Sequence, residues 1–201
     1  MKKIIFTDLD GTLTLRDTYH IFIFHNLTLM MILKNYIGII MMGLKYIFGF
    51  MSKEEVKRSS FKMFFSNYNT KKDIGNFISK IPWNHKIKNI VDAKKNEGYK
   101  VILVSASPDV YLPYICEYLG YDGFLATKTL KDGDNLTGFF DGAVCNHEEK
   151  TRRIKEYLGD NRPKHTLSYG NSLGDYPMLS FCDESYFVKK SDIKKFDALN
   201  L

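Results

Sequence analysis

The sequence predicts an α/β fold: a Rossmann-like parallel sheet core flanked by helices, with an all-helical cap inserted after the first strand. Short apolar runs alternate with helical segments through the second half of the chain, as they do in parallel sheets with helical crossovers. One long helical block interrupts this alternation after the first run. We therefore expect residues 1–14 and 84–201 to form the core and residues 15–83 to form the cap.

The core elements follow from apolar runs and from the residues that begin and end helices. Lys3–Asp8 is an apolar run leading to Gly11, as a buried parallel strand leads into a loop. Glycines close several helical segments, because glycine adopts the left-handed conformation that ends a helix. Beyond Pro82 we expect helices at His85–Glu97, Ser107–Leu119 and Glu148–Leu158, strands at Val101–Val104, Thr166–Tyr169 and Tyr186–Val188, and a hairpin of Phe124–Thr129 with Leu136–Phe140.

The cap is expected to be helical from Thr18 to about Ser79. Ser52 and Glu55 have the spacing of a capping box, which marks a helix start. The segment Ile21–Phe50 is unusually apolar, but Lys34 and Lys45 interrupt it about three turns apart, on one stripe of a helix. A transmembrane helix needs about 20 uninterrupted apolar residues, so the pattern favours packed or membrane-touching helices.

Composition and charge narrow the class of protein. The chain has 201 residues, 44% of them apolar and 26% charged, which excludes wholesale disorder. Residues 15–83 hold ten basic and four acidic side chains and so carry the whole net charge of +6, which predicts that the cap faces something anionic. The three cysteines form no CxxC pair, so we expect free thiols and a reducing cytoplasm.

Two carboxylates follow the first strand. Asp8 and Asp10 are two residues apart at the point where the strand gives way to a loop, so both can reach one site. Ligands of α/β sheets bind at the carboxyl ends of strands. Two acids this close suit a divalent cation, or a nucleophile with an acid–base partner.

Three further elements end or begin with residues that suit phosphate chemistry. Ser105 follows the second expected strand, Lys150 lies early in a helix and offers a cation, and Asn171 and Asp175 follow a later strand. A hydroxyl and backbone N–H groups near a helix start can hold a phosphate. The order Asp–Asp, Ser, Lys, Asn–Asp at successive element ends is hard to obtain by chance.

On these residues the chain resembles the haloacid dehalogenase-like (HAD) superfamily, in the phosphoserine phosphatase-like branch, subfamily IB. The resemblance rests on FTDLDGTLT, LVSAS, the lysine of CNHEEK and YGNSLGDYPML, and on a helical cap directly after the first motif. It implies a Mg²⁺-dependent phosphomonoester hydrolase. Dehalogenases of the superfamily lack the second acid, so Asp10 favours phosphate chemistry, whereas phosphotransferases share the motifs.

The resemblance also implies a role for each site residue. Asp8 would be the nucleophile that forms an aspartyl-phosphate, and Asp10 would protonate the leaving oxygen and then activate water. Ser105 and Lys150 would hold the phosphoryl group. Mg²⁺ would be held by Asp8, Asp10, Asn171 and Asp175. Many relatives have aspartate where this chain has Asn171, which predicts a weaker metal site.

The cap is expected to select the substrate. Asp17 lies where phosphoserine phosphatases carry an acidic residue that meets the substrate amine, and Arg58 could pair with a carboxylate. An apolar cap also resembles that of the bacterial phosphatidylglycerophosphate phosphatase, whose Gly-His-Glu-Lys is similar to the sequence from His147 to Lys150. We expect a phosphorylated small molecule or a lipid head group as partner, no nucleic acid, and a cytoplasmic protein with possible contact to the inner membrane surface through the cap. The alternative outside enzymes is a non-catalytic phosphate-binding module.

Overall fold

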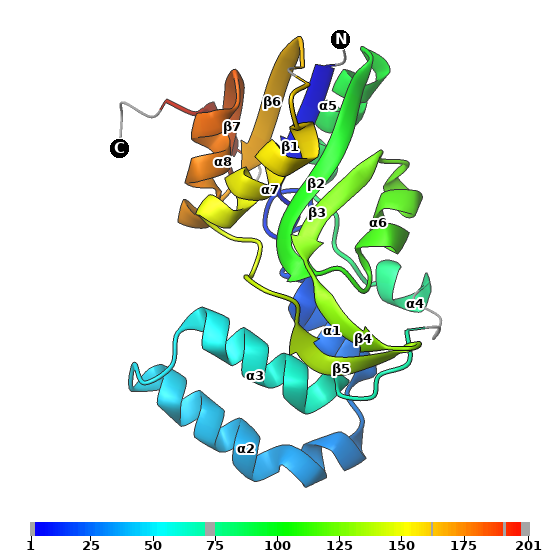
Figure 1. The fold of residues 1–201 in the computed structure, drawn as a ribbon, viewed down its shortest axis with the longest axis vertical. Coiled ribbons are helices and arrows are strands. Elements are labelled where there is room, and N and C mark those ends of the chain that lie inside the picture. The colour runs from blue at the N-terminus through cyan, green and yellow to red at the C-terminus, as the bar shows by residue number, and fades with distance from the viewer. Residues whose placement is uncertain (1–2, 71–74, 162, 191, 198–201) are drawn as a thin grey trace.

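The core is a parallel sheet with helices on both faces, as the sequence predicts (Figure 1). The computed structural model describes residues 3–70, 75–161, 163–190 and 192–197. The six-stranded sheet has the order β3-β2-β1-β6-β7-β8, in which only β8 runs antiparallel to its neighbour. Its strands are β1 (Lys3–Thr7), β2 (Tyr99–Pro108), β3 (Gly123–Thr127), β6 (His165–Gly170), β7 (Glu184–Lys189) and β8 (Asp192–Lys195).

Successive residues of the central strand pack into separate hydrophobic clusters. Ile4 and Phe6 of β1 belong to a cluster with residues of α7 (Glu148–Leu158) and α8 (Tyr176–Phe181). Ile5, between them, packs with residues of α5 (His85–Asn96) and α6 (Leu112–Leu119). Because alternate side chains of a strand point to opposite faces, this arrangement places two helices on each face. Burial of the central strand on both faces explains its continuous apolar run.

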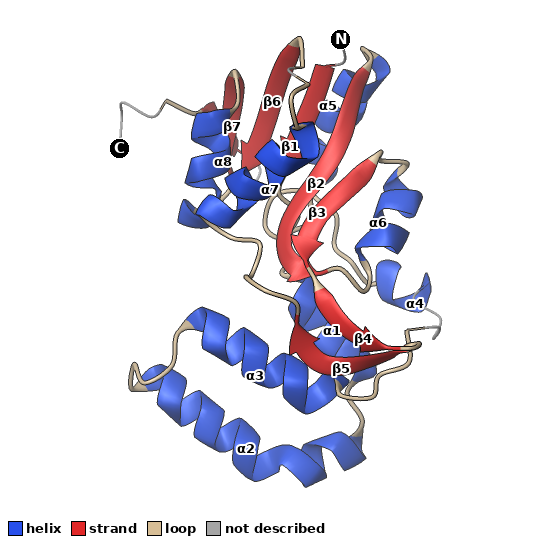
Figure 2. Cartoon of the chain, viewed as in Figure 1, coloured by secondary structure: helices blue, strands red, loops and turns tan. Residues whose placement is uncertain are grey.

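The helical segment after β1 forms a separate layer below the core (Figure 2). The layer contains α1 (Thr18–Asn26), α2 (Leu29–Ile47) and α3 (Lys53–Phe65). The short α4 (Gly75–Ile78) of the same segment lies between α1 and α6 of the core. The expected capping box at the start of α3 is present: Ser52 Oγ accepts from the Glu55 N–H, and the Glu55 carboxylate accepts from the Ser52 N–H. Phe22 of α1 stacks on Phe65 of α3 with ring centroids 4.9 Å apart, which joins these helices.

The expected hairpin forms, but the prediction assigned the wrong residues to its first strand. Phe124–Thr127 lies in β3, which pairs in parallel with β2, and the hairpin consists of β4 (Thr129–Asp132) and β5 (Asn135–Phe140). Strand β5 packs along α3 of the helical layer, and Phe61 of α3 meets Phe140 with ring centroids 4.6 Å apart. A later part of the chain therefore completes the layer that begins at α1.

The predicted start of the next helix, at Ser107, was also wrong. Strand β2 continues to Pro108, which pairs with Thr127, and α6 begins only at Leu112. The strand continues because Thr127 binds both sides of this stretch: its hydroxyl donates to Ala106 O at 2.7 Å, and its carbonyl accepts from Asp109 N at 2.9 Å. Strand β8 was not expected from the sequence. The three cysteines are free thiols, as predicted.

Candidate active site

Asp8 lies at the carboxyl end of β1 and is almost completely buried. Its backbone N–H donates to Tyr169 O on β6 at 2.9 Å, which fixes the end of the strand against its neighbour. One carboxylate oxygen accepts from Lys150 Nζ at 2.7 Å and the other from Thr12 Oγ1 at 2.9 Å. Burial, followed by repulsion from Asp175, raises the pKa of Asp8 to about 7, although Lys150 acts in the opposite direction.

Lys150 joins two of the predicted motifs. It is the third residue of α7, is 1% exposed, and its Nζ lies 2.7 Å from Asp8 Oδ1 and 2.6 Å from Asp175 Oδ1. Burial by itself would lower the pKa of Lys150, but the two carboxylates outweigh it and hold the pKa far above its ordinary value. The lysine therefore stays charged and holds the ends of β1 and β6 together.

Asp10 points toward the helical layer. Its Oδ1 accepts from both the backbone N–H and the hydroxyl of Thr18, each at 2.6 Å, and its Oδ2 accepts from Ser107 Oγ at 2.6 Å. Thr18 is the first residue of α1, so the hydrogen bonds run from the core loop to the layer below it. Burial, followed by the nearby charge of Asp17, raises the pKa of Asp10. A carboxyl with a raised pKa keeps its proton to higher pH than an exposed aspartate and can donate it more readily as a general acid.

Ser105 and Asn171 border the same site. The Ser105 hydroxyl is buried on β2, accepts from the Ser107 N–H at 3.0 Å and lies 3.4 Å from Asp10 Oδ2. The Asn171 side chain lies against the loop after Asp10, because a β-carbon at Gly11 would be 2.1 Å from Asn171 Nδ2. Gly11 also has a φ of +84°, so a larger residue there would be strained as well as crowded.

Asp175 organises the loop that contains Asn171. Its Oδ2 accepts from the backbone N–H of Asn171 at 3.0 Å and from the N–H and hydroxyl of Ser172 at 2.9 and 2.8 Å. Burial alone would raise the pKa of Asp175, but Lys150 and these hydrogen bonds lower it. Asp175 is therefore ionised, whereas the pKa of Asp8 is raised. The two carboxylates thus differ in acidity although both contact the same lysine.

These residues offer oxygen ligands suited to a hard divalent cation. Within the described ranges no three His, Cys, Asp or Glu side chains gather as a metal-binding cluster. The Asp10 carboxyl is turned toward Thr18, and Asn171 supplies an amide in place of a carboxylate. Asp8 and Asp175 nevertheless converge on one lysine, and a divalent cation takes carboxylate, amide and backbone oxygens together. The donor set therefore fits Mg²⁺.

Of the two residues expected to select the substrate, Asp17 lies near the site residues, whereas Arg58 binds other partners. Asp17 caps α1 by accepting from His20 N at 3.1 Å, and its charge acts on Asp10 and on Lys57. Arg58 instead pairs with Glu54 on its own helix at 2.8 Å and donates to Gly142 O at 3.0 Å. Arg58 thus has its partners on α3 and on the loop after the hairpin.

Lys57, the residue before Arg58, is the cation that the sequence analysis missed. Its Nζ crosses from α3 to the core and donates to Ala106 O, next to Ser105, at 2.9 Å. Burial lowers the pKa of Lys57, while Asp10 and Asp17 oppose the shift. Lys57 and Arg58 are adjacent basic residues of one helix, and their side chains point about 100° apart. Their different directions, which the sequence does not show, send Lys57 to the core and Arg58 to Glu54.

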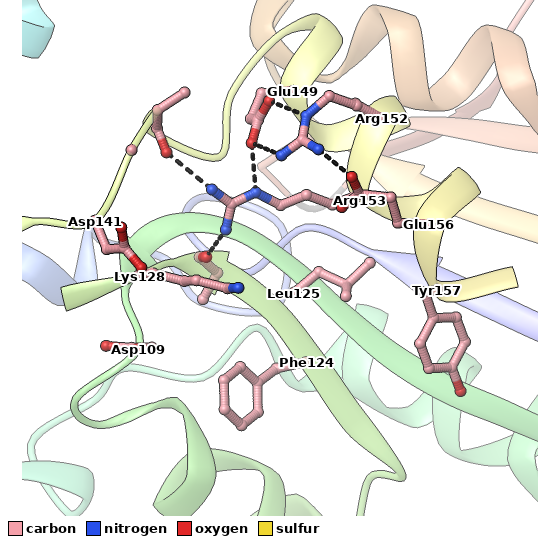
Figure 3. Close-up of a pocket in the computed structure, with 13 residues that line it drawn as sticks. Asp109, Phe124, Leu125, Lys128, Asp141, Glu149, Arg152, Arg153, Glu156 and Tyr157 are labelled. Carbon is pink, nitrogen blue, oxygen red and sulfur yellow. Dashed lines mark hydrogen bonds and ion pairs between the residues drawn. The ribbon is translucent and has the colours of Figure 1, made fainter. Parts of the chain in front are cut away.

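A cavity of about 700 Å³ lies elsewhere on the core, between β3 and α7 (Figure 3). Arg153 crosses it and binds Glu149 at 2.7 Å, the carbonyl of Ala143 at 2.9 Å and the carbonyl of Ala126. None of the predicted site residues lines this cavity. The four charged side chains of α7 that line it pair with one another, and Arg153 joins α7 to β3, so we assign these four a structural role.

Comparison with known proteins identifies relatives of this arrangement. The model of the haloacid dehalogenase-like hydrolase family matches residues 5–180. Protein CicA of Caulobacter vibrioides is 34% identical over 89 residues, which are 44% of this chain and 40% of CicA. The phosphoserine phosphatase of Methanocaldococcus jannaschii is 29% identical over 109 residues, which are 49% of this chain and 51% of that enzyme. The matched part thus spans about half or less of these relatives' length.

A solved structure shares the fold over nearly the whole chain. The protein of unknown function from Bordetella pertussis Tohama I superposes with a TM-score of 0.73 at 16% identity, over 92% of this chain and 89% of that one. This likeness bears out the α/β fold with a helical segment after the first strand. At this identity it concerns the fold alone.

Proposed function

The chain belongs to the haloacid dehalogenase-like hydrolase family, and from that premise we propose that it hydrolyses phosphoric monoesters through a phosphorylated Asp8. The observation that carries the proposal is the buried cluster of Asp8, Lys150 and Asp175 at the carboxyl ends of β1 and β6. A buried carboxylate held by a lysine beside a second, ionised carboxylate is a costly arrangement for stability alone. It suits a site that receives a phosphoryl group and a cation.

In the first step an oxygen of Asp8 attacks phosphorus. The bond from Asp8 to phosphorus forms, the bond from phosphorus to the ester oxygen breaks, and the proton of the Asp10 carboxyl passes to that leaving oxygen. Asp10 suits this task because burial raises its pKa, so that it holds a proton at higher pH than an exposed aspartate. Thr18 and Ser107 keep its carboxyl in one orientation.

In the second step water replaces Asp8. Asp10, now ionised, takes a proton from water as the water oxygen attacks phosphorus, and the bond from phosphorus to Asp8 breaks. Inorganic phosphate leaves and Asp8 is a carboxylate again. Lys150 keeps its charge in both steps and offsets negative charge on the phosphoryl oxygens, while Ser105 offers a hydroxyl to them.

Asp8, Asn171, Asp175 and the Asp10 carbonyl would hold Mg²⁺. When bound, the ion supplies positive charge that lets a phosphate dianion approach a carboxylate. The charge of Lys150 alone is shared between two carboxylates. We therefore propose that activity requires the ion.

We propose that the substrate is a phosphorylated small molecule in the cytoplasm. Asp17 and Lys57 carry opposite charges at the boundary between core and helical layer, which suits a leaving group with an amine and a carboxylate, such as phosphoserine. The partial likeness to a phosphoserine phosphatase supports the same class. Arg58 stays a weaker candidate because its guanidinium already pairs with Glu54.

A second candidate substrate is a lipid head-group phosphate such as phosphatidylglycerophosphate. The observation that favours it is α2, which is apolar and has no buried residue. A substrate that is a small zwitterion does not require an exposed apolar helix in the layer that adjoins its site. In this case the protein would work at the inner membrane surface.

The test is a panel of phosphomonoesters assayed with and without Mg²⁺, on wild type and on Asp8→Asn. We expect phosphate release that needs Mg²⁺ and that Asp8→Asn abolishes while its circular dichroism and melting temperature stay close to wild type. Phosphoserine and phosphatidylglycerophosphate in the panel separate the two substrate classes. A protein that binds phosphate but turns over no ester would be a non-catalytic binding module, and that result would refute the proposal.

A further inference from the structure

Helix α2 presents a strip of apolar side chains away from the rest of the protein. It packs on α3, and Gly38 marks the contact side, because a β-carbon there would lie 2.9 Å from Met63 Cε. Six apolar residues share the opposite side of the helix at its 3.6-residue period. This outer face consists of Leu29, Leu33, Ile37, Ile40, Leu44 and Ile47, each between 44% and 76% exposed.

The outer face is too apolar to be accounted for by packing within the chain. Among the described residues α2 is the one helix long and apolar enough to cross a membrane, with a mean hydropathy of 1.3, and none of it is buried. Phe48 and Phe50, in the turn that follows, are 69% and 79% exposed and extend the apolar surface. Large exposed apolar patches mark contact sites for membranes or other proteins.

The charges around the outer face indicate that its partner is anionic. From Thr18 to Lys53 the sequence contains no aspartate or glutamate, whereas Lys34 and Lys45 lie on α2 itself. These lysines are exposed and, about three turns apart, lie on one flank of the outer face. A basic border beside an apolar strip complements a surface that is anionic outside and apolar beneath, which is the chemistry of a bilayer with acidic lipids.

We propose that the outer face of α2 docks flat on a bilayer surface that contains anionic lipid. The apolar strip would enter the boundary between head groups and acyl chains, while Lys34 and Lys45 meet lipid phosphates. A flat orientation follows from the lysines within the helix and from α3, whose first turn carries Glu54 and Glu55 beside α2. Figure 1 shows α2 at the far end of the helical layer, with the core directed away from it.

A second copy of the chain is a poorer partner for the same face. Each copy would bring the segment that carries the whole net charge of +6 against its like. Like charges at a contact oppose association, whereas anionic lipids attract it. Docking is a binding event that goes beyond the proposed hydrolysis and does not depend on it, so a failed binding assay leaves the activity assay informative.

The test is sedimentation of the full chain with vesicles of phosphatidylcholine, with and without phosphatidylglycerol. We expect binding to the anionic vesicles that weakens as salt is added. Lys34→Gln and Lys45→Gln should each weaken it about fivefold at low salt, since a basic residue near such a surface contributes about 1 kcal/mol. Leu33→Ser combined with Ile40→Ser should weaken it about tenfold or more through lost apolar burial.

Matched controls separate the outer face from exposure in general. Leu130→Ser removes a 42% exposed leucine on β4, and Lys86→Gln removes an exposed lysine on α5; both should bind like wild type. Melting temperatures should confirm that all variants fold. No binding to anionic vesicles at low salt would overturn the proposal, as would equal losses in the outer-face and control variants. Ultracentrifugation showing a dimer that the outer-face variant disrupts, without vesicle binding, would overturn it in favour of self-association.

Discussion

Thr18 offers the sharpest test of how the helical layer contributes to chemistry. Its hydroxyl and its backbone N–H both donate to Asp10 Oδ1 at 2.6 Å, so the first residue of α1 orients the proposed acid–base group of the core. Thr18→Val removes the hydroxyl, keeps a similar shape and leaves the backbone donor and Ser107 in place. The perturbation therefore removes one of three short hydrogen bonds to one carboxyl.

The expected fall in kcat follows from the loss of that single hydrogen bond. A hydrogen bond to a charged group contributes about 1.5–3 kcal/mol, which corresponds to a fall in kcat of about 10- to 150-fold if the bond is made fully in the transition state. This is less than the whole contribution of a general acid, about 10²–10⁴-fold, because the remaining donors still hold Asp10. The substitution should therefore slow the enzyme without abolishing its activity.

The assay compares two kinds of ester. An alkyl phosphate needs its leaving oxygen protonated, whereas p-nitrophenyl phosphate releases a weakly basic oxygen that needs little help. Thr18→Val should therefore slow the alkyl phosphate several times more than the aryl phosphate. Thr12→Val is the matched control, because Thr12 donates to Asp8, and it should slow both esters to a similar degree. Equal losses for both esters in Thr18→Val would show that the Thr18 hydroxyl does not act through proton transfer by Asp10.

Three further predictions concern single side chains. Lys57→Gln should raise KM more than it lowers kcat, whereas Arg58→Gln should change KM little, because only Lys57 donates to the core beside Ser105; a KM equally sensitive to both would contradict this. Asn171→Asp should lower the Mg²⁺ concentration needed for half activity by restoring a carboxylate ligand, and a metal titration that is unchanged would place the residue away from the ion. Hydrogen bonds from Arg152 and Arg153 lower the pKa of Glu149 from 4.5 to about 2, so their contribution to stability is complete above about pH 4.5 and is lost as the pH falls toward 2. Glu149→Gln should thus lower the melting temperature at pH 7, with the difference shrinking in acid.

The convergence of the core motifs was predictable from the sequence because it depends on topology. Asp8 and Asn171 each follow a strand, and Ser105 lies on β2 two residues beyond Leu103, the partner of the last residue of β1. Parallel strands bring such positions to one edge of the sheet. Lys150 could be included because it stands early in the helix that follows the hairpin. The order of these four residues and of the strands along the chain was therefore enough to predict that they lie near one another.

The contributions of the helical layer were not predictable in the same way. Thr18 and Lys57 reach the site only because α1 and α3 take particular orientations against the core, which no local pattern encodes. The hairpin strand was misplaced because the run Phe124–Thr129 extends from β3 to the start of β4. Only the pairing of β3 with β2 and of β4 with β5 divides this run into two strands. The apolar character of α2 was visible in the sequence, but its side facing away from α3 required the structure.

In the proposed mechanism Asp8 carries the phosphoryl group between the two steps. The most direct measurement is mass spectrometry of the protein quenched in acid during turnover of a good phosphomonoester, followed by mapping of the modified peptide. We expect a mass gain of one phosphoryl group in the peptide that contains Asp8, present in wild type and absent in Asp8→Asn. Steady turnover with no phosphorylated protein at any quench time, or a phosphoryl group on a peptide without Asp8, would contradict it.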